Sequence, residues 1–219
     1  MNEGSYAGSE YGRDLKPDYE KISGRDAYVA AGGDLARKSG VDLFEGADDV
    51  SETGADGSAE NTGSDLNEAN NEQIDSILDN FKEDRWSDLS LAEQKQAITD
   101  LADYVAADTG NENPPEIVFR DDMPDGSYGG YIAGTNTIEI NVNMLDDSIE
   151  AADTIAHEMW HAYQQQCAMD PTSEKGKAYQ EGFDNYISPE YDFEGYQDQM
   201  VEAEARDYAQ GFKDRLAGK

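Results

Sequence analysis

The apolar pattern divides the chain into two parts. Residues 1–68 carry few large apolar side chains and contain 16 acidic and 6 basic residues. Such a segment cannot bury enough surface to offset the entropy lost on ordering. We therefore predict an acidic, glycine-rich, disordered region and linker over 1–68, in which only 26–44 has the pattern of a short helix. From 69 to 219 apolar positions recur regularly, which predicts one folded domain.

Helical spacing recurs four times within 69–219. Apolar residues from Ile74 to Phe81 follow the first such pattern. Ser90 and Glu93 then form a capping box, which predicts a second helix ending before Gly110. Longer patterns predict a helix over about 147–167 and a last helix over about 196–216.

Short strands are expected between the second and third helices. Residues 116–120 form one candidate, and 128–133 and 137–142 flank a Gly-Thr-Asn turn, which is typical of a β-hairpin. Alternation predicts that Ile138 and Ile140 face inward and that Asn141 faces outward. The pair at 129–130, Gly-Gly, favours a flexible turn before the hairpin. The predicted fold class is α+β, with two N-terminal helices, a small three- to four-stranded twisted sheet, a helix, a polar tyrosine-rich loop and a C-terminal helix.

Composition narrows the range of partners. The chain has 49 acidic and 16 basic residues and a formal net charge of −33, which argues against binding nucleic acid or anionic membranes. Cys167 is the single cysteine, so neither an internal disulfide nor a thiolate zinc cluster is expected. The first residues lack the apolar segment of a signal peptide. We expect a cytoplasmic protein, with export by a route that needs no such signal as the alternative, and membership of a larger polypeptide or assembly stays open.

The two histidines of the chain lie in one motif. His157 and His161 are four residues apart on the third predicted helix, so both imidazoles project from one face and can bind the same ion. Imidazole nitrogen suits Zn²⁺. Glu158 lies beside the first histidine, where a carboxylate can act as the general base for a water molecule that zinc activates. Met159 and Trp160, between the histidines, are predicted to serve packing.

A catalytic zinc ion needs a third protein ligand, and a carboxylate must provide it because no histidine remains. Glu202 and Glu204 on the last helix are the candidates, and a helical wheel alone does not choose between them. Ala205 and Ala209 lie on the Glu202 side and would allow a close approach to the metal helix. Glu202 is therefore favoured, with Glu204 as the alternative third ligand.

These motifs resemble the gluzincin branch of zinc metallopeptidases, most closely its small members and the metallopeptidase modules of bacterial toxins, phages and mobile elements. The resemblance covers about 116–212 and rests on His157-Glu158-x-x-His161 and on the glutamate motif that begins at Glu202. It implies that His157, His161 and Glu202 bind zinc and that Glu158 is the general base. It also implies that 128–133 or 137–142 forms a sheet edge that pairs with an extended peptide substrate.

The chain departs from this family at two places. Many relatives have, four residues after the ligand glutamate, an aspartate that orients a zinc-bound histidine, whereas this chain has Arg206 there, followed by Asp207. With both histidines used, a tyrosine would have to stabilise the oxyanion. The candidates for that role are Tyr208, Tyr196, Tyr163 and Tyr131.

The resulting hypothesis is a zinc-dependent peptidase that acts on a peptide or protein substrate. The alternative is a zinc-binding, non-proteolytic module with a structural or interaction role in a larger secretion, toxin or phage assembly.

Overall fold

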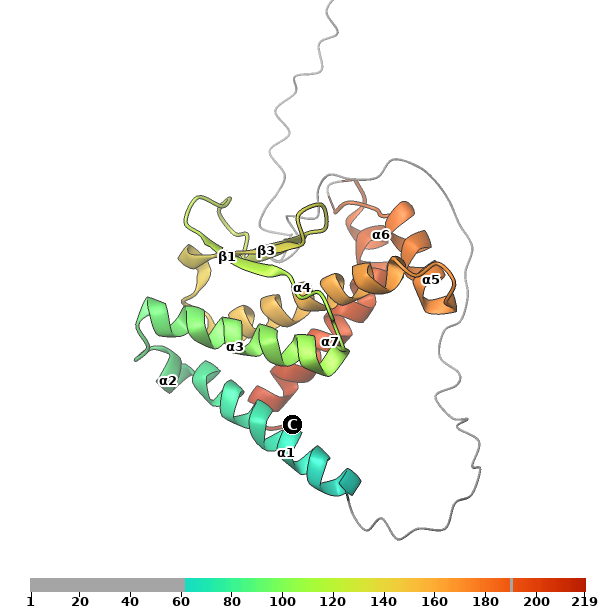
Figure 1. Ribbon diagram of the computed structural model, residues 1–219. Coiled ribbons are helices and arrows are strands. Elements are labelled where there is room, and N and C mark those ends of the chain that lie inside the picture. The colour runs from blue at the N-terminus through green and yellow to red at the C-terminus, as the bar shows by residue number, and fades with distance from the viewer. Residues whose placement is uncertain (1–61, 190) are drawn as a thin grey trace, which may run out of the picture.

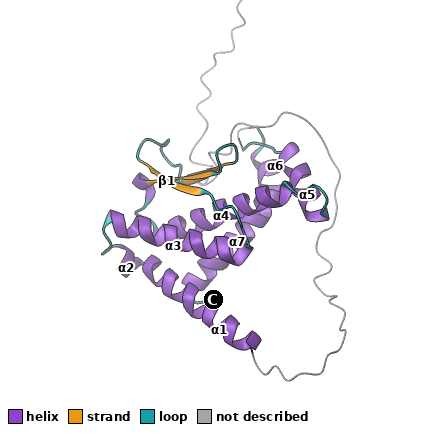
Figure 2. Cartoon of the chain, viewed as in Figure 1, coloured by secondary structure: helices purple, strands orange, loops and turns teal. Residues whose placement is uncertain are grey.

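Helices dominate the part of the chain that the structure describes. It is a computed structural model that describes residues 62–189 and 191–219, so the predicted helix at 26–44 and the linker up to residue 61 lie outside the described residues. Two short 3₁₀-helices, η1 (Asp79–Phe81) and η2 (Val142–Met144), accompany the helices shown in Figure 2. The α-helices are α1 (Thr62–Leu78), α2 (Glu83–Trp86), α3 (Leu91–Thr109), α4 (Ser148–Ala168), α5 (Glu174–Asp184), α6 (Phe193–Asp198) and α7 (Met200–Leu216).

The four helices predicted from apolar spacing correspond to α1, α3, α4 and α7. Ser90 caps α3 with the predicted Ser90–Glu93 box, and Gly110 ends that helix in the left-handed conformation, with φ of 67°. Helix α1 begins at Thr62, so 62–68, which the composition assigned to the linker, are helical. The stretch predicted as a polar loop contains α5 and the start of α6, because Ser173 and Asp192 cap helices that apolar spacing did not reveal. Residues 196–198, predicted as the start of the last helix, belong to α6, and α7 begins at Met200.

Three strands form one small mixed sheet in the order β1-β3-β2. Strand β1 (Glu116–Arg120) runs parallel to β3 (Thr137–Asn141), and β2 (Gly129–Ile132) runs antiparallel to β3. The predicted hairpin is therefore confirmed, and β3 is the central strand. Two segments were expected to form a substrate-binding edge. The segment 128–133 contains β2, which is an edge strand among the described strands, whereas 137–142 contains the central strand β3.

Two expectations about the hairpin are wrong. Gly129 and Gly130 are the first residues of β2 and not a flexible turn. A Cβ atom on Gly129 would lie 2.7 Å from the carbonyl oxygen of Glu139 and 2.9 Å from a methyl carbon of Thr154, so the glycine permits close packing. Asn141, on the face opposite Ile140, is buried and not exposed to solvent, and its Nδ2 donates a hydrogen bond to the Ser127 carbonyl oxygen at 2.7 Å, which satisfies the buried amide.

Helix α4 is the centre of the fold. It packs against α3, α5 and α7 and also lies beneath β2 and β3 (Figure 1). Small residues allow these close contacts, since Ala152 and Ala156 of α4 and Ala205 and Ala209 of α7 have no solvent exposure. Met159 is buried and Trp160 stacks on Tyr208 with ring centroids 4.4 Å apart, in agreement with their predicted packing role. The arrangement brings α4 and α7, the two helices with the candidate ligands, side by side.

None of the described helices combines the length and the hydropathy that crossing a membrane requires. The described residues form an α+β domain built around one buried helix, α4. The small sheet lies on one side of α4 and helices lie on the others.

Candidate metal centre

The histidine motif lies on the buried face of α4. His157 and His161 are 2% and 3% exposed, and Glu158 between them is 1% exposed. The Nε2 atoms of the two imidazoles are 3.0 Å apart, which is the result expected for side chains one helical turn apart on the same face. The helix thus presents two metal-binding nitrogen atoms to one point.

Glu202 on α7 reaches the same point from the neighbouring helix. Its Oε2 lies 3.4 Å from Nε2 of His157, and its Oε1 lies 3.4 Å from Nε2 of His161. Ligand atoms bound at ordinary zinc distances to one tetrahedral ion are separated by about 3.3 Å. The three observed separations are close to that value, so the residues present fit a single ion. Among the described residues, His157, His161 and Glu202 are the one group of histidine, cysteine and acidic side chains that could hold a metal ion.

Two tyrosines hold the Glu202 carboxylate in place. The Tyr186 hydroxyl donates to Oε1 at 2.8 Å and the Tyr196 hydroxyl donates to Oε2 at 2.7 Å. Burial and the Glu202 charge raise the pKa of Tyr186 above its usual range, so this phenol stays protonated and remains a donor. Each carboxylate oxygen therefore has a tyrosine hydroxyl as donor in addition to the imidazole that it faces, which orients the carboxylate before any cation binds.

The electrostatics of the cluster favour a carboxylate beside a charged imidazole. Burial by itself would raise the pKa of Glu202, but the charge of His161 and the hydrogen bonds from both histidines hold it well below its usual range. Burial lowers the pKa of His161, and the Glu202 charge and hydrogen bond outweigh that effect and raise it to about 9. The cluster thus balances its buried negative charge with a positive one, which is the role that a bound cation would also perform.

Glu158 is held beside the cluster by the sheet. Its Oε2 accepts a hydrogen bond from the backbone N–H of Tyr131 on β2 at 2.8 Å. Burial raises the pKa of Glu158 to about 7, with the His161 charge opposing the shift and the Glu202 charge adding to it. A carboxyl group with such a pKa can accept and return a proton near neutral pH.

The amide of Gln164 connects α4 to α7. Its Oε1 lies 2.9 Å from Nδ1 of His161, and its Nε2 donates to the Val201 carbonyl oxygen at 3.0 Å and to Oε2 of Glu204 at 3.2 Å. The Tyr179 hydroxyl donates to the same oxygen of Glu204 at 2.7 Å. Glu204, the alternative third ligand, is thus engaged in this hydrogen-bond chain, while Glu202 faces the histidines.

The tyrosines considered for oxyanion stabilisation have different surroundings. Tyr196 is committed to Glu202. Tyr208 donates to Asp108 at 2.9 Å, and the Tyr163 hydroxyl accepts from Lys175 at 2.8 Å. The Tyr131 hydroxyl donates to Asn136 at 3.0 Å, so its backbone and not its phenol reaches Glu158. Of these four hydroxyl groups, only that of Tyr196 therefore forms a hydrogen bond with the cluster of His157, His161 and Glu202.

At the position where gluzincins often have an aspartate, the side chains have other surroundings. Arg206 donates to the carbonyl oxygen of Gln197, and Asp207 is exposed. The sequence reasoning missed the residues that take over the supporting contacts, namely Gln164, Tyr179 and Tyr186. Gln164 could have been found, because a residue three positions after His161 lies on the same helix face. Tyr186 had no such signal, since only the tertiary fold brings it to Glu202.

Comparisons with known proteins identify no relative: no family model, no curated protein and no solved structure matches this chain.

Proposed function

We propose that this protein is a zinc-dependent metallopeptidase with a gluzincin-type, zincin-like centre. The observation that carries the proposal is the convergence of His157, His161 and Glu202, from two helices, within hydrogen-bond distance of one another and next to Glu158. Two imidazoles and one carboxylate form a donor set typical of catalytic zinc sites, in which three protein ligands leave one position for substrate or water. The motif of Glu158 and the two histidines supports the same assignment.

Each residue has a role in peptide hydrolysis. His157, His161 and Glu202 would hold the ion, which when bound polarises the peptide carbonyl and activates a water molecule. Glu158 would take the proton of that water and return it to the leaving amine. Its hydrogen bond from Tyr131 fixes it against β2. Strand β2 has a side that no described strand covers, which suits the addition of an extended peptide as a further strand.

The decisive variant is Glu158→Gln. It keeps the size of the side chain and an acceptor for the Tyr131 N–H, but it removes the base. We expect one zinc ion per chain in both proteins and a loss of turnover of at least about 100-fold in the variant. The measurement is cleavage of a diverse peptide library, read by mass spectrometry, together with metal analysis of the same samples. Cleavage at the wild-type rate by Glu158→Gln would contradict the mechanism.

The deep burial of the cluster favours a second function, a zinc-binding module that does not cleave peptides. With His157, His161 and Glu202 all at 3% exposure or less, the ion would mainly stabilise the packing of α4 on α7. A chelator distinguishes the two functions. In a structural role it lowers the melting temperature and no peptide is cleaved at any zinc level, whereas in a peptidase it stops cleavage while the protein is still folded.

A further inference from the structure

We infer that Gln164 is a positioning residue of the metal centre: its side-chain amide selects the tautomer of His161 and ties the metal helix α4 to α7, which carries Glu202. The inference rests on the proposed metal site. It concerns a residue that neither the histidine motif nor the downstream glutamate motif includes.

The partners of Gln164 determine which way its amide points. On one side lie the Val201 carbonyl oxygen and a carboxylate oxygen of Glu204, at 3.0 and 3.2 Å. Both of these atoms accept hydrogen bonds, so the NH₂ group of the amide must face them. The carbonyl oxygen of the amide must then face Nδ1 of His161 at 2.9 Å. Because Gln164 has no solvent exposure, water cannot substitute for any of these partners.

The amide orientation in turn determines the state of His161. An amide oxygen only accepts hydrogen bonds, so Nδ1 of His161 carries a proton. The nitrogen left to bind a metal is Nε2, which is the atom that lies 3.0 Å from His157 Nε2 and 3.4 Å from Glu202. A hydrogen bond to the other ring nitrogen is how metal-binding histidines are commonly oriented. Here a glutamine one turn further along the same helix provides it.

The same amide also aligns α7. Val201 immediately precedes Glu202, so the hydrogen bond from Gln164 to the Val201 carbonyl holds the backbone next to the third ligand. Glu204 is held from its other side by the Tyr179 hydroxyl, which extends the chain of hydrogen bonds to α5. One buried side chain therefore couples the ring of His161 to the position of Glu202.

The test uses the untagged full chain, whose two histidines are both in the centre. Gln164→Met keeps the approximate volume and removes every hydrogen bond. We expect zinc affinity, measured by competition with a chelator, to fall about 10- to 100-fold. Nuclear magnetic resonance of histidine-selective ¹⁵N-labelled, zinc-free protein, at a pH where the imidazole is neutral, should show His161 protonated on Nδ1 in the wild type and a mixture of tautomers in the variant.

A matched control lies on the same helix. Gln166 also makes three hydrogen bonds, accepting from Glu112 and Asn113 and donating to Gly110, but it does not contact the centre. Gln166→Met should lower the melting temperature while zinc affinity and the His161 spectrum stay unchanged. This control separates the loss of a hydrogen-bonded amide on α4 from the loss of the contact with His161.

Gln164→Glu divides the two roles of the residue. A carboxylate still accepts from Nδ1 of His161 but cannot donate to the Val201 carbonyl as the amide does. Most of the zinc affinity lost in Gln164→Met and the single tautomer should return, with a stability below that of the wild type. This variant also tests the inference if Gln164→Met does not fold.

The outcomes distinguish the inference from the proposed function. Wild-type zinc affinity and an unchanged His161 tautomer in Gln164→Met would overturn the role of Gln164. Gln164→Glu keeps the acceptor for Nδ1 of His161, whereas Gln164→Met has none. An equal loss of zinc affinity in the two variants would therefore also overturn the tautomer role. A wild-type chain that binds no zinc would instead contradict the proposed function.

Discussion

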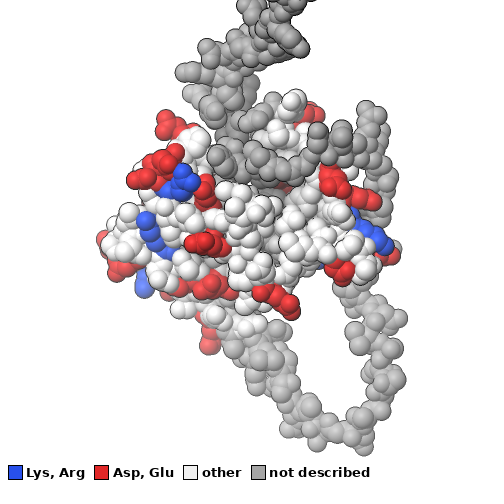
Figure 3. Space-filling model, turned by 45° about the horizontal axis from the view of Figure 1, so that its top comes forward, with Lys and Arg blue, Asp and Glu red and all other residues white. Residues whose placement is uncertain are grey.

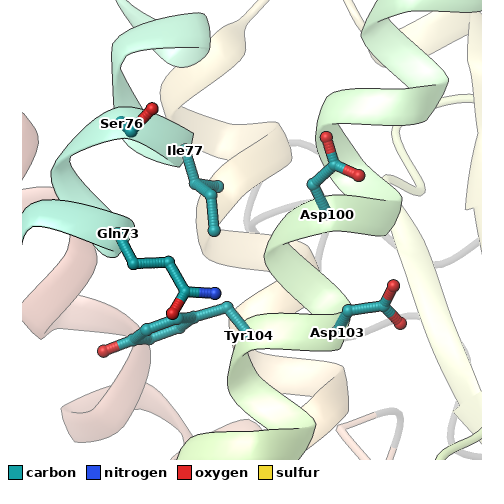
Figure 4. A pocket seen from close by; sticks show the side chains of 6 residues that line it. All are labelled: Gln73, Ser76, Ile77, Asp100, Asp103 and Tyr104. Carbon is teal, nitrogen blue, oxygen red and sulfur yellow. The ribbon is translucent and has the colours of Figure 1, made fainter. Parts of the chain in front are cut away.

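The candidate metal centre and the groove between α1 and α3 both contain acidic side chains, but they differ in burial and in the partners of those side chains. The groove is a hollow of about 410 Å³. Figure 4 shows Gln73, Ser76 and Ile77 of α1 on one side and Asp100, Asp103 and Tyr104 of α3 on the other. It is open, and both polar and apolar groups line it. The histidine–glutamate cluster, in contrast, is buried between α4 and α7.

The contrast shows that carboxylates alone do not make a site in so acidic a chain. Figure 3 shows acidic side chains scattered over the surface with few basic ones between them. Asp103 in the groove is exposed, and water can solvate it at little cost. The Glu202 carboxylate, in contrast, has no solvent exposure, and it contacts two tyrosine hydroxyls and two imidazoles. Burial with fixed partners separates a preorganised ligand from an ordinary surface acid.

Removing Glu202, the proposed third ligand, should have the largest effect. In Glu202→Ala we expect zinc affinity to fall by more than about 100-fold, because losing a direct ligand should exceed the loss of a residue that only supports one. Asp103→Ala, the corresponding change in the groove, should leave zinc affinity unchanged. Competition titrations of both variants against a chelator measure the difference, and similar affinities for the two would remove the distinction between the regions.

Removing one of the tyrosine hydroxyls should have the next largest effect. Tyr196→Phe deletes a buried hydrogen bond to the Glu202 carboxylate, which contributes about 1.5–3 kcal/mol. We expect a matching decrease in the free energy of unfolding or a 10- to 100-fold weaker zinc complex. The control is Tyr104→Phe in the groove, where the change should stay within about 0.5 kcal/mol. Urea unfolding with and without zinc gives both quantities.

Packing above α4 should be sensitive to a single methyl group. In Gly129→Ala the new Cβ would lie 2.7 Å from the Glu139 carbonyl oxygen, so β2 must move away from β3. We expect the free energy of unfolding to fall by about 1–3 kcal/mol. Gly134→Ala in the same hairpin meets nothing within 4 Å and should be neutral or slightly stabilising. Thermal melts of the two variants compare them, and equal melting temperatures would argue against close packing at β2.

The smallest effect is expected in the groove itself. Asp103→Asn removes one exposed charge near Asp100 and should change the free energy of unfolding by no more than about 0.5 kcal/mol, in the stabilising direction. Urea unfolding at low and high salt checks this, because screening should reduce the difference further. A large destabilisation would show that the groove, like the metal centre, contains a structured polar site.

Local signals predicted much of the fold. The capping box of Ser90 and Glu93, the hairpin around Gly134 and the histidine spacing on α4 each depend on residues within a few positions of one another. The parallel pairing of β1 with β3 was not predicted, because it joins segments separated by the whole of β2. Helices α5 and α6 were missed because their polar sequences form short helices that begin at caps and pack against the domain.

In the candidate metal centre too, some features follow from local sequence and others depend on tertiary packing. Sequence alone determined that His157 and His161 share one helix face, with Glu158 beside the first of them, since helical geometry places residues four apart together whatever surrounds them. It limited the proposed third ligand to Glu202 or Glu204 and favoured Glu202, because Ala205 and Ala209 lie on the same side of that helix. Only the tertiary structure turned Glu202 toward the histidines, directed Glu204 to Gln164 and Tyr179, and brought Tyr186 to the cluster. Those contacts cross between elements, so their geometry depends on how α4, α5 and α7 pack, which no spacing along the chain specifies.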